Sequence, residues 1–173
     1  EIANAPSGDK HFFLKDPYDN LWEVKEHPVV FSKGKSVNGG VFGTIIGVTD
    51  IEESLVVYRD ILGFDETVYD ETGVFEDFKE LPGGNQEFRR VLLRHTDIKN
   101  GAFSTLFGKS EIELVQVLKG SPKKIYEGRI WGDPGFIHRL AGGLHHTAHA
   151  GLANEHVMGF LGEHKAAGAA ERI

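Results

Sequence analysis

The chain has 173 residues, of which 40% are hydrophobic, and it carries 26 acidic against 19 basic residues. This length and apolar content suffice for one sizeable core or two small ones, which argues against general disorder. The net charge of -7 makes nucleic acid an unfavourable partner, because the chain repels phosphate backbones at long range. The absence of cysteine excludes disulfides and thiolate chemistry, so any metal would be bound by His, Asp or Glu.

Membrane insertion and secretion are not expected from the hydropathy pattern. No apolar stretch approaches the roughly 20 residues of a spanning helix, and the N-terminus lacks the basic and apolar regions of a signal peptide. We therefore expect a cytoplasmic protein without membrane association. The first residue is Glu1 rather than Met, which suggests a processed product or an excerpt of a longer protein.

Two segments precede the best-patterned part of the chain. Within residues 1–26, the segment from Phe12 to Lys25 is expected to be a turn followed by a strand, since Asp16 to Asn20 has turn chemistry and Leu21 to Val24 is mainly apolar. Residues 27–40 include a proline and a glycine pair and are typical of a linker.

Residues 41–120 follow the order βαβββ. The β-branched run Val41 to Val48 predicts a strand, and apolar residues at helical spacing predict a helix over about 50–62. Either Thr49 with Glu52 or Asp50 with Glu53 can form a capping box at its start, and Gly63 can end it. Three further strands are predicted at Asp65 to Tyr69, Glu87 to His95 and Glu111 to Leu118.

The composition changes after this unit. Residues 121–138 are expected to be a linker followed by the first strand of another unit, because a Gly-Asp-Pro-Gly turn precedes Phe136 to His138. Residues 139–173 form a tail rich in Ala, Gly and His, in which Glu155 to Arg172 could form a weak helix despite its glycines.

Four motifs in this order resemble the vicinal oxygen chelate superfamily, which includes glyoxalase I, the bleomycin resistance proteins and the extradiol dioxygenases. The segment Thr44 to Phe64 resembles the opening strand and helix of one of its modules, and Glu111 to Val115 resembles the closing strand. Asp16 to Val24 looks like the closing strand of a preceding module, with Asp19 in place of a glycine. Asp133 to His138 is similar to the start of the second module of glyoxalase I, one residue shorter.

The resemblance implies an α+β fold in which βαβββ modules of the glyoxalase/bleomycin resistance/dioxygenase type form a curved mixed sheet. Residues 1–26 would then close a preceding module, 41–120 would be a complete one, and 121–138 would begin a third. Since one module cannot close the family's cup by itself, we expect a homodimer or pairing with a second module.

The resemblance also implies a divalent metal, Zn, Ni, Mn or Fe(II), that acts as a Lewis acid on a small oxygenated substrate. Glu113, His138 and Glu23 match the family's ligand positions, and Glu113 is also the expected catalytic residue. Strand alternation places Glu113 with Val115 on the face opposite Leu114, which would pack under the helix. The alternatives are a solvent-facing Glu113, a surface His138 and a Glu23 on a half-exposed strand.

Two glycines depart from the family pattern. Gly43 stands where metal-dependent members commonly present His or Gln, and Gly47 stands where glyoxalase I has an arginine that binds glutathione. Three hypotheses follow: a metal-dependent isomerase, lyase or dioxygenase; a metal-free, drug-sequestering module like the bleomycin resistance proteins; or an incomplete, inactive fragment of a multi-module protein.

Three other features have simpler interpretations. His145 and His149 have the spacing of a helical metal pair, but His146 stands where an HExxH motif needs its Glu. Arginines along the third strand of the unit are expected to be solvated rather than to bind an anionic substrate; they are Arg89, Arg90 and Arg94. Six aromatic residues are expected to belong to a core rather than to stack on a ligand: Phe12, Phe13, Trp22, Phe75, Phe78 and Phe88.

Overall fold

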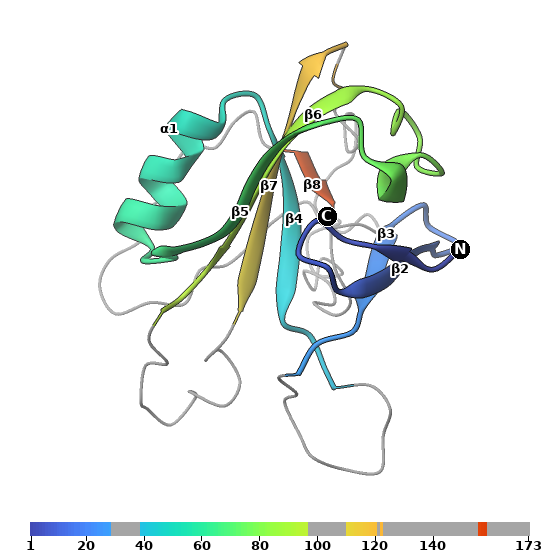
Figure 1. Ribbon diagram of the computed structural model, residues 1–173, viewed down its shortest axis with the longest axis horizontal. Helices are drawn as coiled ribbons and strands as arrows, with labels where there is room; N and C mark the ends of the chain where they lie inside the picture. Colours follow the sequence, from blue (N-terminus) through green and yellow to red (C-terminus); the bar gives the residue numbers. More distant parts are fainter. Residues whose placement is uncertain (29–38, 97–109, 121, 123–155, 159–173) are drawn as a thin grey trace, which may run out of the picture.

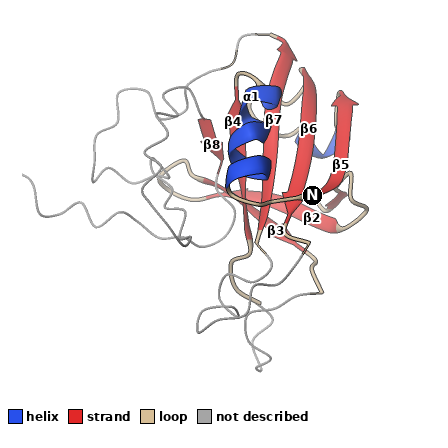
Figure 2. Cartoon of the chain, turned by 90° about the vertical axis from the view of Figure 1, so that its left-hand side faces the viewer, coloured by secondary structure: helices blue, strands red, loops and turns tan. Residues whose placement is uncertain are grey.

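A computed structural model describes residues 1–28, 39–96, 110–120, 122 and 156–158. In these ranges the chain forms two sheets. The smaller one is antiparallel and consists of β1 (Ala3–Asn4), β2 (Lys10–Lys15) and β3 (Leu21–Lys25). The larger one has five strands, and Figures 1 and 2 show helix α1 on one of its faces and the smaller sheet on the other.

The larger sheet contains the four strands predicted for the βαβββ unit. They are β4 (Gly43–Val48), β5 (Glu66–Gly73), β6 (Glu87–Arg94) and β7 (Glu111–Lys119). The strand order is β5-β6-β7-β4-β8, in which β4 runs parallel to β7 and the other neighbours are antiparallel. The expected α+β class with a mixed sheet is therefore confirmed, and β5 extends four residues beyond its predicted end.

The predicted helix is present and continuous. It begins as α1 (Ile51–Leu55) and continues as the π-helical turn η1 (Val56–Ile61), a change in winding that the sequence pattern did not predict. Of the two capping alternatives, Asp50 is the one that caps it, because its carboxylate accepts a hydrogen bond of 3.2 Å from the backbone N–H of Glu53. Gly63 follows with a φ of 78°, the left-handed conformation expected at a helix end.

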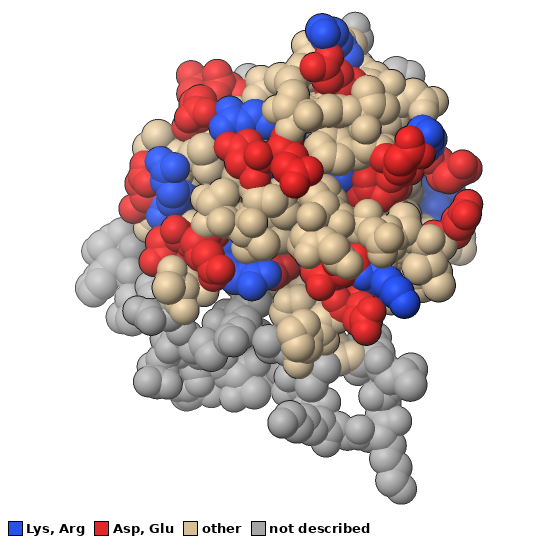
Figure 3. Space-filling view, in the orientation of Figure 1, with Lys and Arg blue, Asp and Glu red and all other residues tan. Residues whose placement is uncertain are grey.

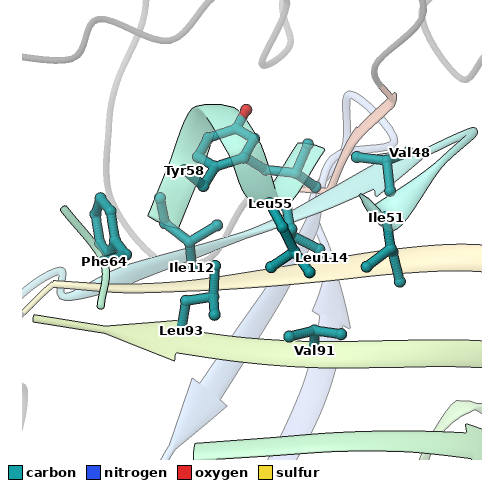
Figure 4. Packing of buried hydrophobic residues seen from close by; sticks show 10 residues of the cluster. Val48, Ile51, Leu55, Tyr58, Phe64, Val91, Leu93, Ile112 and Leu114 are labelled. Atoms are coloured by element: carbon teal, nitrogen blue, oxygen red, sulfur yellow. The ribbon is translucent and has the colours of Figure 1, made fainter. Parts of the chain in front are cut away.

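One face of the five-stranded sheet packs against this helix. Alternate residues of the strands point toward the helix, as Figure 4 shows for Val91, Leu93, Ile112 and Leu114. From the helix, Ile51, Leu55 and Tyr58 complete the cluster, in which every side chain is at most 6% exposed. This apolar layer is the main core, and all its members come from residues 46–114.

The opposite face carries a smaller apolar cluster and a short 3-10 turn, η2 (Glu76–Phe78), between β5 and β6. Its buried members are Ile45, Phe78, Phe88 and Val115, and partly buried Phe13 and Phe75 pack against them. Of the six aromatic residues predicted to lie in a core, Phe78 and Phe88 therefore belong to this cluster, and Phe13 and Phe75 pack against it.

Three expectations need correction or lie outside the description. The turn predicted at Asp16 to Asn20 and the strand predicted at Leu21 to Val24 are both present, the strand as β3, whereas strand β2, which pairs with β3 in register from His11 opposite Lys25, is not predicted by the sequence pattern. Within the predicted helix Glu155 to Arg172, the described residues His156–Met158 form strand β8 instead, paired with β4. The strand predicted at Phe136 to His138 and the pair His145 and His149 lie outside the described residues.

No helix in the described ranges is long and apolar enough to cross a membrane.

Candidate functional site

The face of the five-stranded sheet that lies opposite α1 buries a group of ionisable side chains. Six of them are at most 9% exposed, namely Glu111 and a connected group of five that lies between the two sheets: His11, Glu23, Asp77, Arg90 and Glu113. His11 and Glu23 come from β2 and β3, whereas the other three come from η2, β6 and β7. We call these five residues the buried ionic cluster.

Glu113 lies on the face predicted for it. Its register partner in β4 is Ile45, which belongs to the cluster opposite the helix, while the adjacent Ile112 and Leu114 pack under the helix. The side chain is 3% exposed, so the alternative of a solvent-facing glutamate is excluded. Arg90 donates a hydrogen bond of 2.5 Å from Nε to Oε1 of Glu113.

Arg90 is the centre of the buried ionic cluster. Besides Glu113 it binds Asp77, whose two carboxylate oxygens accept hydrogen bonds of 2.9 and 2.7 Å from Nη1. Its guanidinium carbon lies 3.8 Å from the centre of the Phe78 ring and 4.7 Å from that of Phe75, within the range of a cation–π contact. Arg90 is only 1% exposed, so the expectation of a solvated arginine is wrong at this position.

His11 links the two sheets. Its Nδ1 forms a very short contact with Glu23, and its Nε2 lies 3.3 Å from Oδ2 of Asp77. Burial lowers the pKa of His11, but the adjacent carboxylates of Asp77 and Glu23 outweigh this effect and raise the pKa to about 9. His11 is therefore protonated at neutral pH, and the cluster has two cationic side chains for its three carboxyl groups.

Glu23 is 5% exposed, which excludes the half-exposed alternative for this residue. Burial raises the pKa of its carboxyl group, the contact with His11 opposes this, and the negative charge of Glu113 raises the pKa further. Burial and the same charge of Glu113 also raise the pKa of the Tyr69 hydroxyl. Glu23, Glu113 and Tyr69 thus influence one another electrostatically within one small region.

That region contains a cavity of about 10 Å³, space for roughly one water molecule. Three carboxylates line it, those of Glu23, Glu111 and Glu113, together with Lys25 and the backbone around Gly43. Burial raises the pKa of Glu111, but contacts with His27, Lys25 and Arg94 dominate and lower it to about 2. Glu111 is therefore a carboxylate under all ordinary conditions.

In the described ranges no group of three or more His, Asp or Glu residues converges on a point where a metal could bind. Arg90 and protonated His11 already neutralise the two candidate ligands Glu113 and Glu23. Gly43 contributes no side chain, and a Cβ there would lie 3.0 Å from the carbonyl oxygen of Glu111. The third candidate, His138, lies outside the described residues.

Three members of the cluster were not singled out from the sequence as site residues: His11, Asp77 and Arg90. For Arg90 a signal existed, since strand alternation places it on the face opposite Val91 and Leu93, which pack under the helix. His11 and Asp77 carry no such signal, because they meet only when the two sheets pack together.

Comparisons with protein-family models, with curated proteins and with solved structures find no match to this chain. The resemblance to the vicinal oxygen chelate superfamily therefore remains an expectation from the sequence motifs.

Proposed function

We propose that the protein is a vicinal oxygen chelate module that binds a small oxygenated molecule without a metal, like the drug-sequestering, bleomycin-resistance-like members of that superfamily. The observation that carries this proposal is the presence of Arg90 and protonated His11 among Glu23, Asp77 and Glu113. These two internal cations fill the role that a bound metal ion would have.

The chemistry of the cavity indicates the kind of ligand. Among the described residues its lining includes three carboxylates and one cationic side chain, Lys25, which already pairs with Asp9 at 3.2 Å and Glu111 at 3.4 Å. Carboxylates accept hydrogen bonds, so the ligand group that enters is a donor such as a hydroxyl. The molecule would be bound in the cytoplasm, by a homodimer or by this module paired with a second one.

Buried charge supports a functional role for this face. Burying an ion pair gives little net stability compared with apolar residues of similar volume, because desolvation offsets the Coulomb attraction. Perturbed ionisable groups also gather at functional sites, which agrees with the shifts at His11 and Glu23.

A second candidate is the metal-dependent isomerase, lyase or dioxygenase, with Glu113, Glu23 and His138 as ligands of Zn, Ni, Mn or Fe(II). The specific observation in its favour is that Glu23 and Glu113 line the same cavity and that the charge of one raises the pKa of the other. Bound metal would supply Lewis acid chemistry to the substrate oxygens.

Ligand and metal titrations separate the two candidates. The purified protein is titrated with a library of small oxygenated molecules, with and without a chelator, and its metal content is measured by elemental analysis. The metal-free proposal predicts substoichiometric metal and ligand binding that survives the chelator. Binding that disappears with the chelator, together with full metal occupancy that is lost in Glu113→Gln but kept in the exposed control Glu66→Gln, would favour the second candidate.

A further inference from the structure

The smaller sheet is attached to the larger one by side chains. Within the described residues, no backbone hydrogen bond joins residues 1–28 to the five-stranded sheet, and the two sheets are separate in their strand pairing. Among the contacts between them are the ion pairs of His11 with Asp77 and of Lys25 and His27 with Glu111, the edge-to-face contact of Phe13 with Phe78, and the stacking of His27 on Phe42 just before β4.

The charges at this junction are already paired on each side of it. In the smaller sheet, His11 contacts Glu23, and Lys25 lies 3.2 Å from Asp9. In the larger sheet, Arg90 holds both Asp77 and Glu113, and Arg94 lies 2.5 Å from Glu111. Separation of the sheets would therefore leave every one of these carboxylates with a cationic partner, while water would hydrate the newly exposed groups.

The main core does not depend on the smaller sheet. Among the described residues, the cluster under α1 is built from residues 46–114, and Phe13 is the one residue of the smaller sheet that packs against the apolar cluster on the other face. Buried ion pairs contribute little net stability because rehydration offsets their loss. Separation of the sheets thus requires much less free energy than disruption of the main core.

We infer that residues 1–28 are a cover that opens as a unit from the five-stranded sheet while that sheet stays folded, and that this opening admits molecules to the face that carries Glu113. Such local opening below the free energy of global unfolding is general in proteins. In the closed form the cavity holds only about one water molecule, so any larger molecule needs this opening. The opening itself does not depend on the proposed function, whereas its role as an entry route rests on it.

Thiol labelling can test the cover because the natural chain contains no cysteine. Leu92 and Leu93 are neighbours in β6 and are 4% and 0% exposed. Leu92 lines the cavity under the cover, together with Ala5 and Glu23 of residues 1–28, whereas Leu93 belongs to the core under the helix. The variants Leu92→Cys and Leu93→Cys are thus a matched pair. The first places a thiol on the sheet face under the cover, and the second places it on the face under the helix.

Each variant is labelled with a thiol reagent under native conditions, and its global stability is measured by urea unfolding. We expect Leu92→Cys to react at least about tenfold faster than its own global unfolding equilibrium allows, while Leu93→Cys reacts at the globally limited rate. Equal rates, each limited by global unfolding, would overturn the inference. A fast reaction of both variants would also overturn it, since the helix face would then open as well.

Hydrogen exchange on the unsubstituted protein tests the same inference even if a cysteine variant fails to fold. A small sheet that has lost its packing partner is only marginally stable, so the amides of β2 and β3, which bond to each other, should lose protection when the cover opens. They are expected to exchange together, at least about tenfold faster than those of β6 and β7. Equal protection of the two sheets would contradict the cover. This measurement needs no ligand, so its outcome is independent of whether the proposed binding function is correct.

Discussion

The two faces of the five-stranded sheet are equally buried but chemically opposite. Under the helix, ten apolar side chains form one continuous layer with no charged member. On the other face, a smaller apolar cluster adjoins a buried ionic cluster of five residues. Burial of an apolar side chain stabilises the fold whichever apolar groups surround it, whereas a buried charge needs a specific counter-charge. The first face therefore provides stability, and the second provides a chemically selective surface.

The largest effect should follow from removal of the central cation. In Arg90→Met, the carboxylates of Asp77 and Glu113 lose their buried partner, so the free energy of unfolding should fall by about 3–5 kcal/mol. Urea unfolding at neutral pH measures this. The combined variant with Asp77→Asn and Glu113→Gln should recover much of the loss. A loss of less than about 1 kcal/mol in the single variant would mean that these charges are not truly desolvated.

Truncation on the helix face should be costly for a different reason. Leu114→Ala removes a side chain that is 0% exposed, so we expect a loss of about 2–5 kcal/mol from lost transfer free energy and the remaining cavity. The decrease in the free energy of unfolding should be the same at low and high salt. The decrease caused by Arg90→Met, in contrast, should become smaller when Asp77 and Glu113 are neutralised. If a second-site charge change rescued Leu114→Ala, the proposed contrast between the two faces would fail.

Alkaline pH should weaken the ionic face selectively. The pKa of His11 is raised to about 9 in the folded protein, so its contribution is complete below the ordinary histidine pKa of 6.5 and is lost as the pH rises through about 9. The shift corresponds to a loss on the order of 3 kcal/mol over that interval. Urea unfolding from pH 6 to 10 tests this, and His11→Gln should flatten the dependence. A flat profile in the unsubstituted protein would show that folding does not raise the pKa of His11.

The smallest loss of stability is expected at Arg89, the residue next to Arg90 in the chain. Arg89 forms ion pairs of 2.7 Å with Glu52 and Asp70, but these carboxylate side chains are 72% and 40% exposed. Figure 3 shows acidic and basic side chains next to one another over one face of the molecule, where water screens such pairs. Arg89→Met should therefore cost less than about 1 kcal/mol by urea unfolding. A loss equal to that of Arg90→Met would remove the distinction between surface and buried pairs.

Local sequence signals predicted most of the larger sheet. The β-branched run before Asp50, the cap at Asp50 and the glycine at position 63 act over a few residues each, so they could be recognised without knowledge of the fold. Strand alternation likewise placed Glu113 on the face away from the helix. The π-helical winding of η1 and the strand at Lys10–Lys15 were not predicted, since both depend on what packs beside them.

The sequence by itself determined the βαβββ order and the apolar face under the helix, because periodicity and capping are properties of neighbouring residues. Only the tertiary structure decided that Arg90 is buried rather than solvated, and that His11 from β2 meets Asp77 from η2. Those contacts join residues far apart in the chain, and the desolvation that shifts their pKa values exists only once the two sheets have packed together.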